Sequence, residues 1–251
     1  MTLKGRVAIV TGGGKGIGAV FAAGLAKEGA SVLVADIDDN GAKDVAARIC
    51  ADGGAAKSCH VDVSDQASAT AMARAAADAF GGIDILVNNA AMYANLKRRP
   101  FYELTPEEFD RVLAVNVKGP WLTTLAVFPF MRERGKGKII NVSSSSTFLG
   151  ANRLAHYVAS KMGIIGLTRA LARELGDHNI CVNVIQPGMT DSQANRSITP
   201  PERHLAEAAE RSIKRVEVPE DLLGTLIFLA SDGSDFMTGQ SLLVDGGRYF
   251  N

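Results

Sequence analysis

The chain has 251 residues, of which 47% are hydrophobic and 22% are charged, and its 27 Lys and Arg residues balance 27 Asp and Glu residues. This composition is typical of a globular protein with a large core, and the balanced charge excludes an overall field that attracts nucleic acid or a membrane surface. No apolar run has the length of a bilayer span, and the three cysteines lie far apart without metal-ligand spacing. We therefore expect a single cytoplasmic domain over residues 1–251, with no metal, nucleic-acid or membrane partner.

The first part of the chain alternates short apolar segments with Ala-rich segments. We predict strands at 6–10, 31–35, 56–61 and 84–87, and helices at 17–27, 40–51 and 67–80. Alternation at this spacing is typical of βαβ units, whose parallel strands form one sheet with helices on both faces. The predicted fold class is therefore α/β.

A glycine-rich loop, TGGGKGIG at 11–18, separates the first strand from the first helix. Such a loop binds phosphate, because glycine leaves backbone N–H groups accessible and the helix N-terminus carries partial positive charge. Asp36 ends the second strand about 20 residues further on, where a carboxylate hydrogen-bonds an adenosine ribose and repels a 2′-phosphate. The pattern predicts NAD over NADP, although Lys15 within the loop favours a 2′-phosphate.

A longer helix is predicted from Thr105-Pro106-Glu107-Glu108, where Thr is the N-cap and Pro the first helical residue. It continues past Asn116 towards Arg132, with Pro120 and Pro129 interrupting or kinking it. Asn116 lies among apolar residues, so its amide needs partners, either backbone groups at a kink or a water near the reactive site.

The remaining predicted elements are strands at 138–142, 180–185 and 241–244 and helices at 155–175 and 219–230. Residues 162–171 are apolar on nearly every side, which favours a subunit interface. Between the strand at 180–185 and the helix at 219–230, the segment 189–218 is polar and poorly periodic. One helix is expected in it, which starts at Thr199 by the same Thr-Pro-Glu capping pattern as at Thr105 and runs to about 213. An insertion of this kind is where a substrate lid would lie.

Tyr157 and Lys161 are four residues apart on the predicted helix 155–175, so their side chains share one face. A nearby cation lowers a tyrosine pKa, and this allows a tyrosine to act as an acid/base near neutral pH. Ser144 follows the strand 138–142, a position where open α/β sheets place reactive side chains. In isolation the pair would be a half-buried phenol and a solvated charge; the other motifs favour catalysis.

Together these motifs resemble those of the short-chain dehydrogenase/reductase family over the whole chain. The matching motifs are TGGGKGIG at 11–18, Asp62-Val63, NNAA at 88–91, Asn116, Ser144, YVASK at 157–161, Pro187-Gly188 and the ending TGQSLLVDGG. The resemblance implies a Rossmann-like, doubly wound, seven-stranded parallel sheet, an NAD cofactor and a homotetramer or homodimer.

The resemblance also implies a role for each matching residue. Tyr157 would be the general acid/base, Ser144 would hydrogen-bond the substrate oxygen, and Lys161 would lower the Tyr157 pKa and bind the cofactor ribose. Asn116 would hold a water of the proton relay. The other implied cofactor-binding residues are Gly12, Lys15, Gly16, Ile17 and Gly18 at the pyrophosphate, Asp36 and Ile37 at the adenosine ribose, Asp62 and Val63 at the adenine, Asn89 near the nicotinamide ribose, and Pro187, Gly188, Thr190 and Ser192 at the carboxamide.

Two residues depart from the family pattern. Ala91 stands where the family usually has Gly, and its Cβ narrows the space beside the nicotinamide. Ser192 stands where the family usually has Thr, and it keeps a hydroxyl there.

The substrate is less well defined by the sequence. The expected walls are Met92, Tyr93, 146–148, Asn152, Leu154, Met189 and the lid 192–215. They are mostly apolar, which favours a small or medium secondary alcohol, including cyclic and aromatic ones, and its ketone or aldehyde; His156 is expected to be structural. Three alternatives remain: an NADPH-dependent 3-oxoacyl thioester reductase, a sugar or polyol dehydrogenase with more polar walls, and a non-catalytic nucleotide-binding scaffold.

Overall fold

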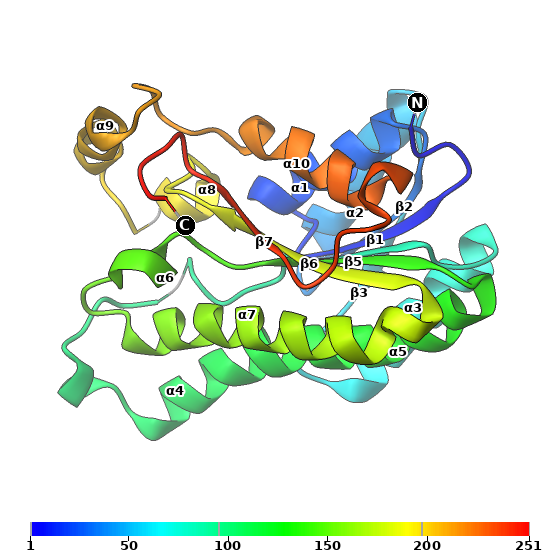
Figure 1. Ribbon diagram of the computed structural model, residues 1–251, viewed down its shortest axis with the longest axis horizontal. Coiled ribbons are helices and arrows are strands. Elements are labelled where there is room, and N and C mark those ends of the chain that lie inside the picture. Colours follow the sequence, from blue (N-terminus) through cyan, green and yellow to red (C-terminus); the bar gives the residue numbers. More distant parts are fainter. Residues whose placement is uncertain (1, 95, 197, 251) are drawn as a thin grey trace.

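The computed structural model describes residues 2–94, 96–196 and 198–250 of the chain. Within these residues, seven parallel strands form one sheet in the order β3-β2-β1-β4-β5-β6-β7 (Figure 1). The strands are β1 (Val7–Thr11), β2 (Ser31–Asp36), β3 (Ala55–His60), β4 (Ile85–Asn88), β5 (Gly137–Val142), β6 (Ile180–Pro187) and β7 (Ser241–Val244). This confirms the predicted Rossmann-like α/β fold.

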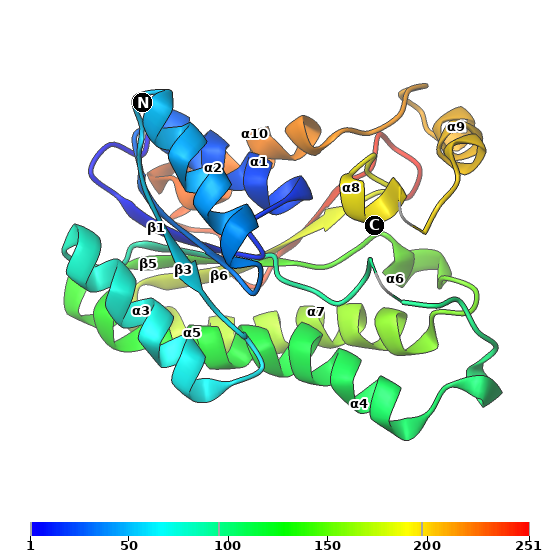
Figure 2. The ribbon, with the colours of Figure 1, turned by 180° about the vertical axis from the view of Figure 1, so that it is seen from behind.

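Helices cover both faces of the sheet (Figures 1 and 2). One face carries α1 (Gly16–Lys27), α2 (Asp39–Ala51) and α10 (Leu223–Ala230), and the other carries α3 (Gln66–Phe80), α4 (Pro106–Leu113), α5 (Gly119–Arg134) and α7 (Ala155–Leu175). The short helices α6 (Ser146–Leu149), α8 (Gln193–Arg196) and α9 (Pro201–Glu210) lie beyond the carboxyl ends of β5 and β6. No helix within the described residues is long and apolar enough to span a membrane.

The strands β1, β5 and β6 are buried along their whole length because both faces of the sheet are covered. Successive side chains of a strand point to opposite faces, so Ala8 and Val10 belong to one core and Ile9 to the other. The first core packs against α1, α2 and α10, with Phe21 at its centre. The second packs against α3, α5 and α7 around Met72 and Met131.

The strand order reverses between β1 and β4, which are direct neighbours. In open α/β sheets ligands bind outside the carboxyl ends of the strands at such a switch point. The glycine-rich loop leaves β1 here, and the Asn88-Asn89 motif leaves β4 beside it. The topology therefore brings the cofactor motifs to one edge of the sheet.

The long helix predicted from Thr105 differs from its expected course. Thr105 caps α4 as predicted, accepting from Glu108 N at 3.2 Å. Between α4 and α5 the chain makes a π-helical turn, Ala114–Lys118, instead of a proline break. Pro120 lies in the first turn of α5, where its missing N–H costs little, and Pro129 lies inside α5, which continues to Arg134. The interruption is thus the π turn around Asn116, a device that is frequent at functional sites.

Two further predictions are corrected by the structure. Thr199 does not cap α9, because its hydroxyl donates to Asn195 Oδ1 at 2.9 Å; Pro200 takes the N-cap position and α9 ends at Glu210. The helix predicted at 219–230 begins with a 3₁₀ turn, Pro219–Leu222, before α10. The other predicted elements agree with the structure to within one or two residues at each end.

Candidate active site

The glycine-rich loop is folded so tightly that side chains cannot replace its glycines. Gly12 and Gly16 have φ values of +62° and +56°, which other residues rarely adopt. A Cβ on Gly12 would lie 2.8 Å from Ala90 Cα, and a Cβ on Gly18 would clash with the Gly12 carbonyl. A Cβ on Gly16 would instead point into open space, because its nearest neighbour, Ser192 Cβ, would be 3.9 Å away. The loop can therefore hold a pyrophosphate on the side that faces Ser192.

Asp36 is 6% exposed at the end of β2, and its carboxylate is already oriented by two backbone groups. It accepts from Gly14 N at 2.8 Å and from Asp38 N at 2.9 Å. A carboxylate has about four acceptor sites, so both oxygens can still accept from ribose hydroxyls. The exposed Lys15 and the 66%-exposed Ile37 flank this position.

Asn89 joins the two strand ends at the switch point. Its Nδ2 donates to Thr11 O at 3.1 Å and to Gly12 O at 3.0 Å, while Thr11 Oγ1 accepts from the N–H groups of Asn89 and Ala90 at 3.2 Å each. The side-chain amide of Asn89 therefore stabilises the conformation of the glycine-rich loop. The contact of Asn89 with the nicotinamide ribose stays a prediction.

Asp62 and Val63 follow β3 at the adenine end of the proposed site. Asp62 accepts from Ser64 N at 2.9 Å and from Ser64 Oγ at 2.6 Å, which closes a turn. The N-cap of α3 is Asp65, so Asp62 does not cap this helix. Val63 is buried.

Tyr157, Ser144 and Lys161 meet at the carboxyl end of β5. Tyr157 and Lys161 lie on α7 and are 8% and 4% exposed. The Ser144 hydroxyl hydrogen-bonds the Tyr157 phenol oxygen. Lys161 Nζ lies 5.7 Å from the centre of the Tyr157 ring and donates to Val142 O at 2.8 Å. The structure thus brings together the three side chains that the sequence named for catalysis.

Asn116 is buried in the π turn, and both ends of its side-chain amide are bonded to protein groups. Oδ1 accepts from Met92 N at 2.8 Å, and Nδ2 donates to Ser160 Oγ at 3.0 Å and to Met92 O at 3.3 Å. Its side chain therefore ties α7 to the segment after β4, and the water of the proton relay stays a prediction.

Burial controls the acid/base properties of the site. Burial raises the pKa of the Tyr157 phenol above its ordinary value, and the hydrogen bond from Ser144 offsets this only in part. Burial also lowers the pKa of Lys161 to about 8. Burial is the largest effect on the Tyr157 pKa, and the ammonium of Lys161 is not among the groups that shift it, so the lowering of this pKa by Lys161 stays a prediction. At neutral pH the phenol is protonated and can donate.

The segment after β6 faces the glycine-rich loop, and Ser192 is its residue nearest to Gly16. Gly188 N donates to Val244 O at 3.0 Å, which fixes the turn that follows Pro187. Thr190 and Ser192 are 2% and 8% exposed. Their hydroxyls have partners: Thr190 Oγ1 donates to Glu217 at 2.8 Å, and Ser192 Oγ accepts from Asn195 N at 3.3 Å.

The predicted substrate walls are only partly confirmed. Tyr93 packs against the Tyr157 ring, with centroids 4.9 Å apart. Ser146 Oγ is buried and has no hydrogen-bond partner among the described residues. Leu154 is not a wall, because it is 1% exposed in a small core cluster behind Tyr157. His156 is completely buried, 3.9 Å from Glu108, and burial lowers its pKa, as expected for a structural histidine.

A surface hollow of about 870 Å³ lies between α7 and β7, outside the catalytic set. Thr147 and Phe148 line it, together with Arg169 and Arg173, but Ser144 and Tyr157 do not. Chemistry at Tyr157 therefore does not take place in this hollow.

Three residues of the lid region had escaped the sequence analysis: Asn195, Arg211 and Glu217. Each is at most 7% exposed, and each is bonded to the segment that contains Met189 and Thr190. Their segment is polar and poorly periodic, so no local pattern marks them as buried.

Comparisons with known proteins agree with this geometry. A family model described as "Enoyl-(Acyl carrier protein) reductase" matches residues 12–248. An uncharacterised oxidoreductase of Mycobacterium tuberculosis is 46% identical over 243 residues, which cover 97% of each chain. Galactitol 2-dehydrogenase of Agrobacterium fabrum is 39% identical over 262 residues, which cover 100% of each chain.

A solved structure is also similar over nearly the whole chain. It is a protein of Beutenbergia cavernae, assigned provisionally as an NAD(P) dependent gluconate 5-dehydrogenase and holding NADP at low occupancy. The TM-score is 0.91 and the sequences are 36% identical over 98% of each chain. The chain therefore belongs to the short-chain dehydrogenase/reductase family, and it is an oxidoreductase that acts on CH–OH groups.

Proposed function

We propose that the protein is an NAD-dependent dehydrogenase that interconverts a secondary hydroxyl of a polyol or sugar derivative and the corresponding ketone. The convergence of Ser144, Tyr157 and Lys161 beyond β5 carries the proposal of alcohol–carbonyl chemistry. The named relatives support the substrate class, because they are described as acting on galactitol and gluconate. The polyol alternative therefore replaces our first expectation of a small or medium apolar alcohol.

Polar side chains among the predicted substrate walls support a substrate with several hydroxyls. Ser146 Oγ, buried and without a partner among the described residues, is available to a second substrate hydroxyl. Asn152, two positions past the Gly150 turn, is exposed. Each hydroxyl of a buried polyol needs such a partner, because an unsatisfied polar group costs about 1–3 kcal/mol.

The catalytic side chains divide the work as follows. In oxidation the deprotonated form of Tyr157, the phenolate, takes the proton of the substrate hydroxyl, while the Ser144 hydroxyl hydrogen-bonds the same oxygen as charge develops on it. In reduction the raised pKa keeps Tyr157 protonated, so it can give the proton back to the carbonyl oxygen. Lys161, with a pKa of about 8, is mostly protonated at neutral pH and can donate to ribose hydroxyls. The bound nicotinamide supplies the hydride acceptor or donor.

The residues at the switch point fit a dinucleotide. The glycine-rich loop is open on the Gly16 side, where a pyrophosphate would lie, and Asp36 presents oriented carboxylate oxygens to the adenosine ribose. A 2′-phosphate would meet like charge at Asp36, so NAD is preferred even though Lys15 is nearby. Thr190 and Ser192 would hold the carboxamide through backbone and hydroxyl groups.

We also propose that the protein forms a homotetramer or homodimer. Trp121 and Leu125 on α5 are each 43% exposed, and Met162 on α7 is 53% exposed, on two helices that cover the same face of the sheet. Large apolar side chains that share a face favour contact with a second copy. Light scattering would test this, and a monomeric mass for the unaltered protein would overturn it.

The substrate class is tested by a panel measured through NADH absorbance. The panel contains galactitol, gluconate, 1-phenylethanol and a 3-oxoacyl thioester, each with NAD(H) and with NADP(H). We expect turnover of a polyol or sugar acid with NAD and little with 1-phenylethanol. Turnover confined to the thioester with NADPH, or to the aryl alcohol, would overturn the proposal, and no turnover with any compound would favour a non-catalytic nucleotide-binding protein.

A further inference from the structure

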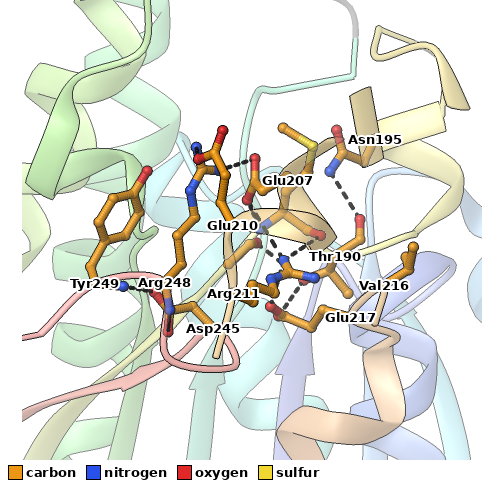
Figure 3. Close-up of polar contacts among 12 residues, drawn as sticks. Thr190, Asn195, Glu207, Glu210, Arg211, Val216, Glu217, Asp245, Arg248 and Tyr249 are labelled. Atoms are coloured by element: carbon orange, nitrogen blue, oxygen red, sulfur yellow. Dashed lines mark hydrogen bonds and ion pairs between the residues drawn. The ribbon is translucent and has the colours of Figure 1, made fainter. Parts of the chain in front are cut away.

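Arg211, directly after α9, is 2% exposed and is among the largest fully buried side chains of the described residues. Its Nη2 donates to Met189 O at 3.0 Å and to Glu217 Oε2 at 3.2 Å, and its Nη1 donates to Arg215 O at 3.1 Å (Figure 3). An arginine is almost never buried so completely unless it is paired. The partners here include the backbone of the segment between Gly188 and Thr190.

Glu217 holds the same segment from its side chain and its backbone. Its Oε1 accepts from Thr190 Oγ1 at 2.8 Å, and its backbone carbonyl accepts from Asp191 N at 2.7 Å. It is 4% exposed, so the Arg211–Glu217 pair is shielded from solvent on both sides.

Glu207 extends the network to the lid helix and to the chain end. Its Oε1 accepts from Met189 N at 3.3 Å and lies 3.6 Å from Arg211 Nη2, and its Oε2 pairs with Arg248. Both backbone polar groups of Met189 are therefore held by side chains from α9 and the loop after it. Figure 3 shows these residues converging from three separate stretches of the chain.

The network packs directly against Gly188. A Cβ on Gly188 would lie 3.1 Å from Arg211 Nη2 and would collide with Glu217 Oε2. The side chains of Arg211 and Glu217 are thus in contact with the turn at Gly188, so a displacement of either side chain would shift the Gly188 backbone.

We propose that Arg211, together with Glu217, is a positioning residue. It fixes the position of the Gly188–Thr190 backbone at the nicotinamide end of the site and couples that position to the position of α9. This inference rests on the proposed function, because it matters only if the segment from Pro187 to Ser192 binds the cofactor. A buried ion pair adds little stability compared with apolar residues, so its geometric specificity is the better reason for its presence.

The charges around Glu217 make the network sensitive to pH. Glu217 faces Arg211 and the Thr190 hydroxyl, the like charges of Asp221 and Asp245, and the more distant cation of Arg215. Burial is the main cause that raises the pKa of Glu217 to about 7, and the two aspartates add to it. Protonation as the pH falls through this value removes one charge of the pair and leaves Arg211 with Glu207 as its acidic partner.

The test compares Arg211→Met with Arg215→Met. Arg215 is on the same loop, but its side chain is 56% exposed and pairs with Asp221. Its loss removes a charge in the neighbourhood of Glu217 but leaves the hydrogen bonds of Arg211 and Glu217 to Met189 and Thr190 in place. NADH binding is measured by fluorescence titration, which needs no substrate. We expect Arg211→Met to raise the NADH Kd about tenfold or more and Arg215→Met to change it less than about twofold, because a small displacement of a binding backbone is costly.

Hydrogen exchange of the amides from Gly188 to Ser192, measured without NADH, gives a second readout. Arg211→Met should speed their exchange, and Arg215→Met should not. If Arg211→Met does not fold, Glu217→Gln replaces it, because glutamine keeps an acceptor for Thr190. We expect the NADH Kd of the unaltered protein to change near pH 7, where Glu217 titrates, and the NADH Kd of Glu217→Gln to lack this change.

The outcomes separate the two proposals. If the unaltered protein binds neither NADH nor NADPH, the proposed function fails. If it binds NADH, but the folded Arg211→Met and Glu217→Gln variants bind equally well and exchange their amides at unaltered rates, the positioning role is overturned while the proposed function stands.

Discussion

The ring of Tyr93 packs against the ring of Tyr157, with centroids 4.9 Å apart and planes inclined by 45°. Tyr93 also donates from its hydroxyl to Asn195 Oδ1 at 3.2 Å, and Asn195 Nδ2 donates to Thr190 O at 2.9 Å. The residue next to the catalytic phenol is thus bonded through one amide to the backbone of the proposed carboxamide segment. Tyr93 therefore shields Tyr157 and joins the substrate side of the site to its cofactor side.

Removing the Tyr93 ring should weaken both substrate binding and the stability of the fold. We expect Tyr93→Ala to raise the substrate KM and to lower the free energy of unfolding by about 2–4 kcal/mol, since a large aromatic contact is lost. Tyr93→Phe keeps the ring and loses one hydrogen bond, so its cost should be about 1 kcal/mol with a smaller change in KM. Urea unfolding and steady-state kinetics measure both. An unchanged KM in Tyr93→Ala would show that the ring does not border the substrate.

Tyr157→Phe should fold and bind NADH but lose turnover by a factor of about 10² to 10⁴, the usual contribution of a general acid/base. The matched control is Tyr102→Phe, because Tyr102 is 74% exposed and remote from Ser144. Near-native turnover of the Tyr157 variant would contradict the acid/base assignment.

Lys161→Met should make the protein more stable at pH 7 and inactive. Burial lowers the pKa of Lys161 from 10.5 to about 8, so the folded state binds this proton less tightly than the unfolded state. Above pH 10.5 the lysine is neutral in both states and its burial costs no folding free energy. As the pH falls from 10.5 to about 8 the unfolded state takes up the proton first, so the folded state loses stability; below about 8 this destabilisation is constant. The substitution removes that cost, although Val142 O loses a donor, and we expect a net gain of about 1–2 kcal/mol at pH 7.

The gain should shrink when unfolding is measured near pH 10, where the unaltered protein no longer carries the full cost. Lys43→Met, at an exposed position on α2, is the control and should show neither effect. A Lys161→Met protein that is less stable at pH 7 would indicate that the hydrogen bond to Val142 outweighs the burial of the ammonium.

Asp36→Asn should shift cofactor preference towards NADP. The amide can keep one acceptor for Gly14 N but no longer repels a 2′-phosphate, and Lys15 remains beside it. We expect the ratio of kcat/KM for NADP to that for NAD to rise about tenfold or more. Asp39→Asn is the matched control, because Asp39 is about half exposed and pairs with His60. An unaltered ratio would remove Asp36 from the basis of selectivity.

Much of the fold could be predicted from local patterns. The helix Ala155–Leu175 and the strand Ser241–Val244 agree with the sequence to the residue, because periodicity and flanking turns are local properties. The π turn at Asn116 could not be predicted in this way, because it depends on the bonds of that amide to Met92 and Ser160, far away in the chain. The absent cap at Thr199 has a local cause instead, because Asn195, four residues earlier, takes its hydroxyl.

The sequence by itself identified the side chains that we propose for the chemistry. The four-residue spacing of Tyr157 and Lys161, the glycines after β1 and the acid at Asp36 are each short-range patterns, and together they define the family. Only the tertiary structure decided how those groups behave. Burial from all sides raises the Tyr157 pKa, and Arg211 and Glu217, polar residues of an unpatterned segment, are paired beneath Met189 and Thr190. Desolvation and ion pairing depend on which distant segments pack together, and no local spacing encodes them.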